Sequence, residues 1–369
     1  MNQLFRWDQM GLFLLALAAG ILPFAVPEVC AAALREGLTL CSGPLLLSLF
    51  PFLVVSRLLI QCPESDLLAL PFRLAAWGIG IRTPCAARVL CIGFLGGFAP
   101  AASAAAQAVR TGQLTAEEAD ALLPACICSG PSFVVLTVGQ SLLGSAELGV
   151  LLFAAQITAN YLTAALLNRF AGVRSVKPGS AAPASPAPPR LDEILADAAI
   201  TYCKLCGFIL FFRMLAAGAG ALLPAGAGTL CAILLEVCSG CDLASRTGWW
   251  GSLLCCAALS VQGLSVLLQV RTICPPEMTL RPLYRARMLH LPLSLALFYL
   301  LLPGGEADVF STLPARVLLM RRVPPDCALL VFAVCCMAAC TLRSGIRQVE
   351  QKQMARNAGG CCINSKTLL

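Results

Sequence analysis

Residues 121–146 read ALLPACICSGPSFVVLTVGQSLLGSA and contain no Asp, Glu, Lys or Arg. A helix rises 1.5 Å per residue, so about 20 apolar residues cross the ~30 Å hydrocarbon layer of a bilayer. This stretch is long enough, but its middle reads Ser129-Gly130-Pro131-Ser132. Glycine ends helices and proline starts them, so the sequence predicts two half-helices that meet at 129–132. A simple proline kink in one span is the alternative interpretation.

The helix before this break has a clear start signal. Thr115-Ala116-Glu117-Glu118 has the spacing of a capping box, in which the threonine hydroxyl and the second glutamate each cap the other's backbone N–H. We therefore expect a helix to begin here and to continue towards Cys128.

The rest of the chain has the same apolar character. Of its 369 residues 59% are hydrophobic and only 12% are charged, about half the charged share of a soluble domain. Further candidate segments are a short run at 327–342 and the run 194–212, which Asp197 and Lys204 interrupt. The sequence predicts an all-α polytopic membrane protein with about 8–10 membrane segments in two related halves. Uncharged runs of 18 residues or more lie at 9–27, 37–56, 89–109, 121–146, 148–168, 214–235, 247–270 and 288–305.

The largest change in composition is at 173–190, which is rich in Ala, Pro and Ser and is typical of a linker. It divides the chain into a first membrane half at 1–172 and a second at 191–342, followed by a polar tail at 343–369. Basic residues gather in the linker region and in the tail, which indicates a cytoplasmic location for both. We expect a multi-pass membrane protein, with its first apolar run retained as an anchor.

The second half also contains an interrupted apolar run. Ser260-Val261-Gln262-Gly263-Leu264-Ser265 places polar side chains and a glycine inside 247–270, and Gln269 follows. An earlier pair corresponds loosely, with Gly96-Gly97-Phe98-Ala99-Pro100 in the first half and Ser239-Gly240-Cys241-Asp242 in the second. Interrupted apolar segments at matching places in two halves are typical of transporter binding sites, where half-helix N-termini face the solute.

Two ionisable residues need an explanation of their own. Glu236 follows a long uncharged run, and a carboxylate at membrane depth costs about 2.5–3.5 kcal/mol. In one interpretation the Glu236 carboxylate contacts the solute or a cation, or carries a proton during transport. In the other, the helix ends at Glu236 and the carboxylate lies at the membrane interface. His290, the sole histidine, follows several arginines and is expected at the interface.

These patterns define the expected site and its chemistry. No catalytic residue, metal or cofactor is expected, since no phosphate-binding loop appears and the cysteine pairs Cys203/Cys206 and Cys238/Cys241 favour packing over zinc. A coupling cation, Na⁺ or H⁺, is left open, as is a homo-oligomer. The expected partners are a small solute and the lipid bilayer, and no nucleic acid. The predicted substrate-binding residues are Ser129, Gly130, Pro131, Ser132, Glu236, Ser239, Gly240, Gln262, Gly263, Ser265 and Gln269.

Several of these motifs, in order and over roughly residues 38–300, resemble a known family. The Ser-Gly-Pro block with Glu118 and Ala119 upstream is the most specific part. The chain resembles sporulation integral membrane proteins of the nucleoside-recognition ("gate") superfamily. The other matching motifs are Gly93 to Gly97, Gly112 to Glu118, Thr137 to Gly139, Leu235-Glu236, Ser239-Gly240, Gly263 to Ser265 with Gln269, and Arg281, Tyr284, Arg287 and His290.

The resemblance implies a fold similar to that of concentrative nucleoside transporters, with re-entrant hairpins around a central site. It further implies transport of dipicolinic acid or a nucleoside-like solute, in the membrane surrounding the forespore. The chain departs from the family pattern at Ile127 and Cys128, where asparagines are usual, and at Gln262, which replaces the first of two glycines. A non-transporting assembly or scaffold protein of the spore envelope is the alternative function.

Overall fold

The computed structural model describes residues 2–61, 63–171 and 190–302, and every element in these ranges is a helix. The first half contains α1 Asn2–Ala25, α2 Pro27–Ser42, α3 Pro44–Gln61, η1 Pro63–Asp66, α4 Leu70–Gly78, α5 Pro84–Gly96, α6 Phe98–Arg110, α7 Ala116–Cys126, η2 Ser132–Leu142 and α8 Ala146–Ala171. The second half contains α9 Leu191–Leu222, α10 Ala225–Leu235, α11 Val237–Ser245, η3 Gly248–Trp250, α12 Gly251–Val261, α13 Gly263–Ile273 and α14 Arg281–Leu301. The prediction of an all-α fold is confirmed for these ranges.

Three helical stretches are long and apolar enough to cross a membrane: Ala146–Ala171, Leu191–Leu222 and Gly248–Ile273, the last of which comprises η3, α12 and α13. A fourth span results if Phe13–Ala25 and Pro27–Ser42, bent by 110° at their junction, are counted together. These spans support an α-helical membrane protein. The predicted number of segments is higher because the prediction counted each uncharged run as one membrane segment. The runs 89–109, 121–146 and 214–235 are instead divided between shorter helices.

The two halves repeat one order of elements. In the first half, the pairs α5–α6 and α7–η2 are each interrupted, at Gly97 and at 127–131, and the long helix α8 follows. In the second half, α10–α11 and α12–α13 are interrupted at Glu236 and Gln262, and α14 follows. The predicted breaks at 129–132 and 260–265 are therefore confirmed.

Local sequence explains where the half-helices begin. The predicted capping box is present: the Thr115 Oγ1 accepts from the Glu118 N–H at 3.1 Å, and the Glu118 carboxylate accepts from the Thr115 N–H at 3.2 Å. Pro131 immediately precedes η2, which is π-helical over its whole length. Such i→i+5 helices are rare and occur mostly as short bulges, frequently at functional sites.

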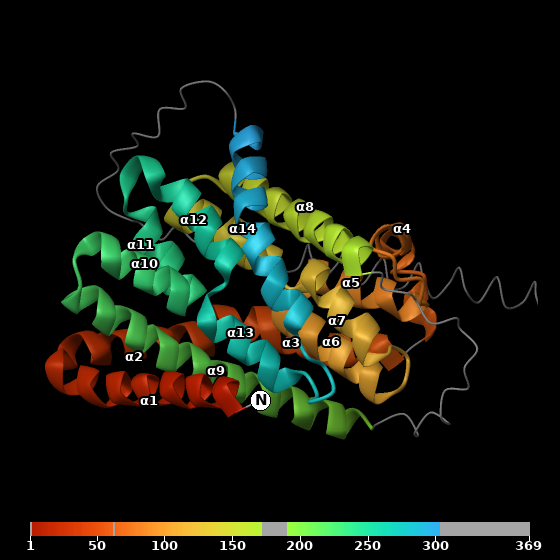
Figure 1. Cartoon of the computed structure of the whole chain (residues 1–369), viewed down its shortest axis with the longest axis horizontal. Helices are drawn as coiled ribbons and strands as arrows, with labels where there is room; N and C mark the ends of the chain where they lie inside the picture. The colour runs from red at the N-terminus through yellow and green to blue at the C-terminus, as the bar shows by residue number, and fades with distance from the viewer. Residues whose placement is uncertain (1, 62, 172–189, 303–369) are drawn as a thin grey trace, which may run out of the picture.

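The halves pack into one body in which α14 lies against α8, α7 and α12, and α9 lies against α2, α3, α10 and α13 (Figure 1). The first interface is central, since α14 runs through the middle of the molecule beside α8. Small residues permit close approach, most clearly in α6, which helps to bring broken helices from both halves together. Its fully buried alanines are Ala99, Ala101, Ala102, Ala104, Ala105, Ala106 and Ala108.

Candidate functional site: the crossing of four helix breaks

The two breaks of the first half touch each other. Gly97, between α5 and α6, has φ +81°, a left-handed conformation that suits glycine. A Cβ atom at this position would lie 2.7 Å from the Gly130 nitrogen and 3.0 Å from the Gly130 Cα. The backbone at the first break thus lies directly against the backbone at the second.

The two breaks of the second half make the matching contact. Gly263, at the start of α13, has φ +70°, and a Cβ atom there would lie 2.9 Å from the Glu236 nitrogen and from the Leu235 carbonyl. The preceding residue, Gln262, also has a positive φ, of 62°. The α12–α13 break therefore packs on the α10–α11 break.

A single carbonyl joins the two pairs of breaks. The Ile127 oxygen, at the end of α7, accepts from Gln262 Nε2 at 3.4 Å, from Asn160 Nδ2 at 3.3 Å and from an Arg287 guanidinium nitrogen at 2.5 Å. The same guanidinium also donates to the Ser260 carbonyl at 3.4 Å. We call the place where these groups meet the crossing.

The crossing lies near the middle of two candidate spans. Gln262 is close to the midpoint of Gly248–Ile273, and Asn160 is close to the midpoint of Ala146–Ala171. If these spans cross a bilayer, the crossing lies deep in the hydrocarbon layer. Interrupted backbone is tolerated there only where protein or a water-filled cavity covers it.

Several buried polar atoms at the crossing have no hydrogen-bond partner. They include Arg287 Nε, Asn160 Oδ1 and Gln262 Oε1, whose parent side chains are 7%, 1% and 1% exposed. Such atoms are rare, because an unsatisfied buried group costs about 1–3 kcal/mol. Among the described residues, Arg287 makes no ion pair with a carboxylate. The crossing thus offers one positive charge together with unused donors and acceptors.

A second layer of polar groups supports the crossing from α8, α12 and α14. The Gln156 amide donates to Ser260 Oγ at 3.0 Å, and Ser260 Oγ lies 2.5 Å from Ser294 Oγ. His290 Nε2 lies 3.2 Å from the Gln156 carbonyl, and its Nδ1 is unpartnered. His290, which was expected at the membrane interface, has a side chain that is 1% exposed and packs between helices.

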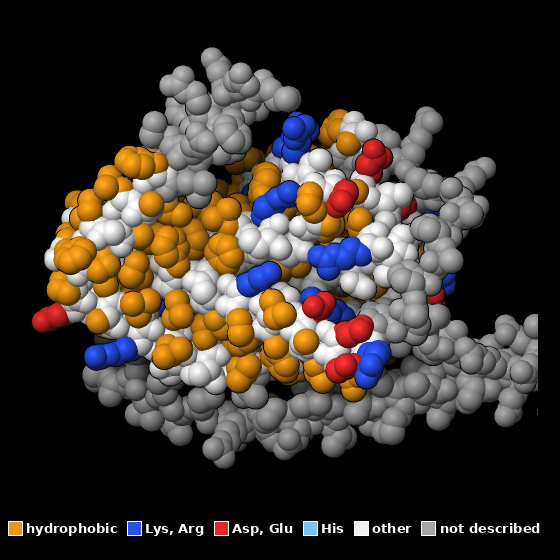
Figure 2. All heavy atoms as spheres, turned by 90° about the horizontal axis from the view of Figure 1, so that it is seen from below, with side chains coloured by type: hydrophobic (Ala, Val, Ile, Leu, Met, Phe, Trp, Pro, Cys, Tyr) orange, Lys and Arg blue, Asp and Glu red, His pale blue; other side chains and the backbone are white. Residues whose placement is uncertain are grey.

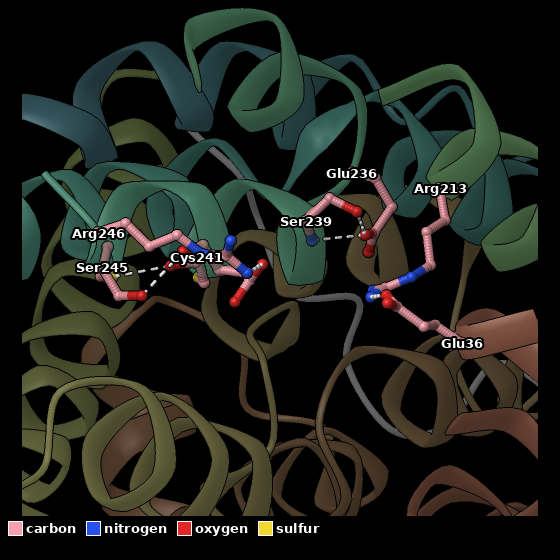
Figure 3. A network of polar contacts seen from close by, with 9 residues as sticks. Glu36, Arg213, Glu236, Ser239, Cys241, Ser245 and Arg246 are labelled. Atoms are coloured by element: carbon pink, nitrogen blue, oxygen red, sulfur yellow. Dashed lines mark hydrogen bonds and ion pairs between the residues drawn. The ribbon is translucent and has the colours of Figure 1, made fainter. Parts of the chain in front are cut away.

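Glu236 is buried at 2% exposure and caps α11. Its carboxylate accepts from the Cys238 and Ser239 N–H groups at 2.8 and 2.7 Å and from Ser239 Oγ at 2.8 Å. Figure 3 shows this cap beside Arg213, which bonds Glu36 at 2.7 Å. The helix does end before Glu236, as one interpretation expected, and the carboxylate lies buried inside the protein.

The structure distributes the predicted binding residues unevenly. Gln262 and Gly263 lie at the crossing, and Ser265 bonds Gln269, whose Oε1 is unpartnered, one turn away. Gly240 lies inside α11, where a Cβ atom would meet the Ile233 Cα at 2.8 Å, so this glycine serves helix packing. The α10–α11 break lies at Glu236, a few residues before the expected 239–242.

The first-half candidates lie beside the crossing to different degrees. Ser129 is 8% exposed, and Gly130 and Pro131 are partly covered, whereas Ser132 is exposed at the start of η2.

Arg287, the charged residue of the crossing, was not among the binding residues predicted from the sequence. Arg287 was named only in the motif that carries the family resemblance, and Asn160 was not among the predicted binding residues either. A signal existed in the spacing of Arg287 and His290, one helical turn apart on α14, which puts both on one face. Which face is buried depends on how α14 packs, and that is a property of the tertiary structure.

The buried breaks, the apolar spans and the all-helical architecture define the class: an α-helical membrane protein with interrupted helices. Within the described ranges, no three His, Cys, Asp or Glu side chains are grouped to hold a metal ion. Comparison with protein-family models, with curated proteins and with solved structures gives no match for this chain.

Proposed function

We propose that this protein is a permease for a small anionic solute that binds at the crossing. The observation that carries the proposal is Arg287, a buried cation without a carboxylate partner among the described residues, at the meeting point of four helix breaks. Burial of an unpaired charge is strongly unfavourable, so buried charges are normally paired. A bound carboxylate supplies the missing negative charge.

The surrounding groups suit the recognition of an anion. The N-termini of η2 and α13 begin at the breaks, and helix N-termini attract negative charge. The N-terminus of α11 is different, because Glu236 already caps it. The amides of Gln262 and Asn160 add a polar lining, and each keeps an unused oxygen that can accept a hydrogen bond from a solute hydroxyl or protonated group.

The arrangement also supports movement of the solute. In many secondary transporters, discontinuous helices from two repeats surround a site near the bilayer midplane, and one repeat moves against the other. The repeated order of broken helices in the two halves of this chain supports the same kind of movement around a central site. Dipicolinic acid, a planar dicarboxylate suggested by the family resemblance, is a suitable test solute, and a function in sporulation at the forespore membrane belongs to this proposal.

The test is uptake of labelled dipicolinic acid into proteoliposomes that contain the purified chain. We expect Arg287→Gln to reduce uptake at least tenfold, because the loss of one buried charge-assisted contact costs about 1.5–3 kcal/mol. Arg246→Gln is the matched control, since Arg246 is exposed and pairs with Asp242 on α11. The control is expected to retain uptake, and a thermal melt of each variant separates lost binding from lost folding.

Other solutes decide between the alternatives. Uptake of uridine that is unaffected by Arg287→Gln would contradict the assignment of an anionic solute. No uptake of either compound, combined with stable co-purification of partner proteins, would favour a non-transporting assembly component of the spore envelope.

A further inference from the structure

A second polar feature lies where α3, α6, α9 and α13 meet, at the ends of α3, α6 and α13. A cavity of about 160 Å³ opens there. It is separate from the crossing, and its residues have no part in the function proposed above. The polar lining consists of Arg57, Arg110, Lys204, Asp197, Ser103, Thr201 and Thr272.

The charges in this cavity are unbalanced. Arg57 is 9% exposed and is held by Asp197 at 2.6 Å, Thr201 at 3.2 Å and Ser103 at 3.3 Å. Asp197 is therefore neutralised by Arg57. Arg110 and Lys204 make no hydrogen bond or ion pair with any described residue, so the cavity has two cations in excess.

Part of this excess is offset by the helices themselves. Helices α3, α6 and α13 end at the cavity, and each C-terminus carries roughly half a negative charge within its last turn. This favours the placement of Arg57 and Arg110, which lie in or next to those turns. Lys204 projects from the interior of α9 and has no such compensation, so it remains available for an external anion.

We propose that this cavity binds the phosphate headgroup of an anionic membrane lipid. Its volume is below the roughly 300–1,000 Å³ of pockets that enclose whole drug-sized molecules, which limits the occupant to a single charged group. Basic pockets between membrane helices are a recurrent form of lipid headgroup site. The anion bridges Lys204 and Arg110. Thr272 lies at the rim, where its hydroxyl already donates to the Gln269 carbonyl at 2.8 Å.

The position along α9 favours a lipid over a free ion. The part of α9 from Leu205 to Leu222 contains Arg213 as its one charged residue and is about 27 Å long, close to the hydrocarbon thickness. Lys204 is thus at the level of the headgroups. Ile200, in the cavity wall, is 55% exposed and offers apolar surface to an acyl chain.

The distribution of charged and apolar side chains on one face agrees with a position of Lys204 at the level of the headgroups. On the face that lies below in Figure 1, most charged side chains, basic and acidic, gather towards one end, and broad apolar surface covers much of the other (Figure 2). A cation beside apolar surface is the arrangement expected at a membrane boundary, where long basic side chains extend to the headgroups.

The experiment measures the thermal stability of the purified full chain in detergent with added phosphatidylglycerol, phosphatidylcholine or inorganic phosphate. We expect phosphatidylglycerol to raise the melting temperature and the other two to have no effect. In Arg110→Gln/Lys204→Gln the concentration of phosphatidylglycerol needed should rise at least tenfold, because each cation near an anionic lipid surface contributes about 1 kcal/mol. The matched control, Arg169→Gln/Arg246→Gln, removes two exposed cations elsewhere and should respond like the unaltered chain.

Two outcomes overturn the proposal. An equal response to phosphatidylglycerol in the cavity variant and the control would place lipid binding elsewhere. Stabilisation by inorganic phosphate alone would assign the cavity to a free anion. Equal melting temperatures of the variants in phosphatidylcholine show that the substitutions leave the fold intact.

Discussion

Gln262 combines two properties that rarely occur together. Its backbone has φ 62° and ψ −4°, a left-handed conformation that costs a non-glycine residue about 1–2 kcal/mol. Its amide reaches across to the Ile127 carbonyl of the other half. Glycine adopts such a positive φ without this cost. The side chain therefore gives this chain a contact that glycine cannot make, at the expense of backbone strain.

Two substitutions at Gln262 separate these effects. Gln262→Gly relieves the strain but removes a long hydrogen bond, so we expect the free energy of unfolding to change by less than about 1 kcal/mol. Gln262→Val loses the amide and puts a β-branched side chain at positive φ, and should cost about 2–3 kcal/mol. Denaturant titration in detergent measures both. Equal losses in the two variants would show that the amide, and not the backbone, determines stability at this position.

Individual residues also show how far sequence reasoning reaches. Breaks with glycine or proline, at 129–132 and at Gly263, could be predicted because these residues have distinct backbone preferences. The break at Glu236 has neither, and the residue itself starts α11 through its carboxylate. Arg287 could not be placed at the crossing, because its burial depends on contacts with Ile127 and Ser260, distant in sequence.

At the scale of elements, η2 and α8 pack unusually closely. A Cβ atom on Gly139 would lie 2.4 Å from the Gly149 Cα, and one on Gly149 would lie 2.8 Å from the Val135 Cα and carbonyl. The π-helical η2 is therefore held against α8 by backbone contact. This contact positions the segment that begins at the 127–131 break.

Replacement of Gly149 by alanine tests that contact. Gly149→Ala forces η2 away from α8 and should lower the free energy of unfolding by about 1–3 kcal/mol, the usual cost of overpacking. Gly207→Ala is the matched control, because Gly207 lies in α9 with no atom within 4 Å of an added Cβ. The control should be neutral or gain about 0.5–1 kcal/mol from helix propensity. A thermal melt in which both variants behave alike would contradict the close packing.

The number of elements was harder to predict than their type. Apolar composition identified helices correctly, and the capping box located the start of α7. Hydropathy alone could not distinguish one span from two half-helices, as with 214–235, which Leu223 and Pro224 divide. The candidate segment 327–342 and the tail lie outside the described residues, as do residues 173–189 of the linker.

At the scale of the whole molecule, the two halves share an extensive interface. Helix α14 packs on α7 and α8, α9 packs on α2 and α3, and α13 packs on α6. Asp120 on α7 adds a polar connection: its carboxylate accepts from the Thr279 N–H and Oγ1 at 2.8 and 2.7 Å and from the Leu280 N–H at 3.1 Å. These contacts predict that the halves associate without a covalent connection.

Co-expression of residues 1–172 and 191–369 as separate chains tests this. We expect the tagged first half to retain the second through purification in mild detergent. Asp120→Ala should weaken the complex, since it leaves two backbone N–H groups and a hydroxyl without their acceptor, whereas Asp192→Ala, at an exposed position in α9, should not. Complete separation of the unaltered halves would show that the linker holds the molecule together.

The Ile127 carbonyl has a consequence for the energetics of solute entry. A carbonyl oxygen has two lone pairs, but three side chains compete for this one. One of the three donors is therefore always bound weakly. It can turn to an incoming carboxylate while the Ile127 oxygen keeps its other two hydrogen bonds. Because the third donor is available, a solute can bind, and later dissociate, with little net loss of hydrogen bonding.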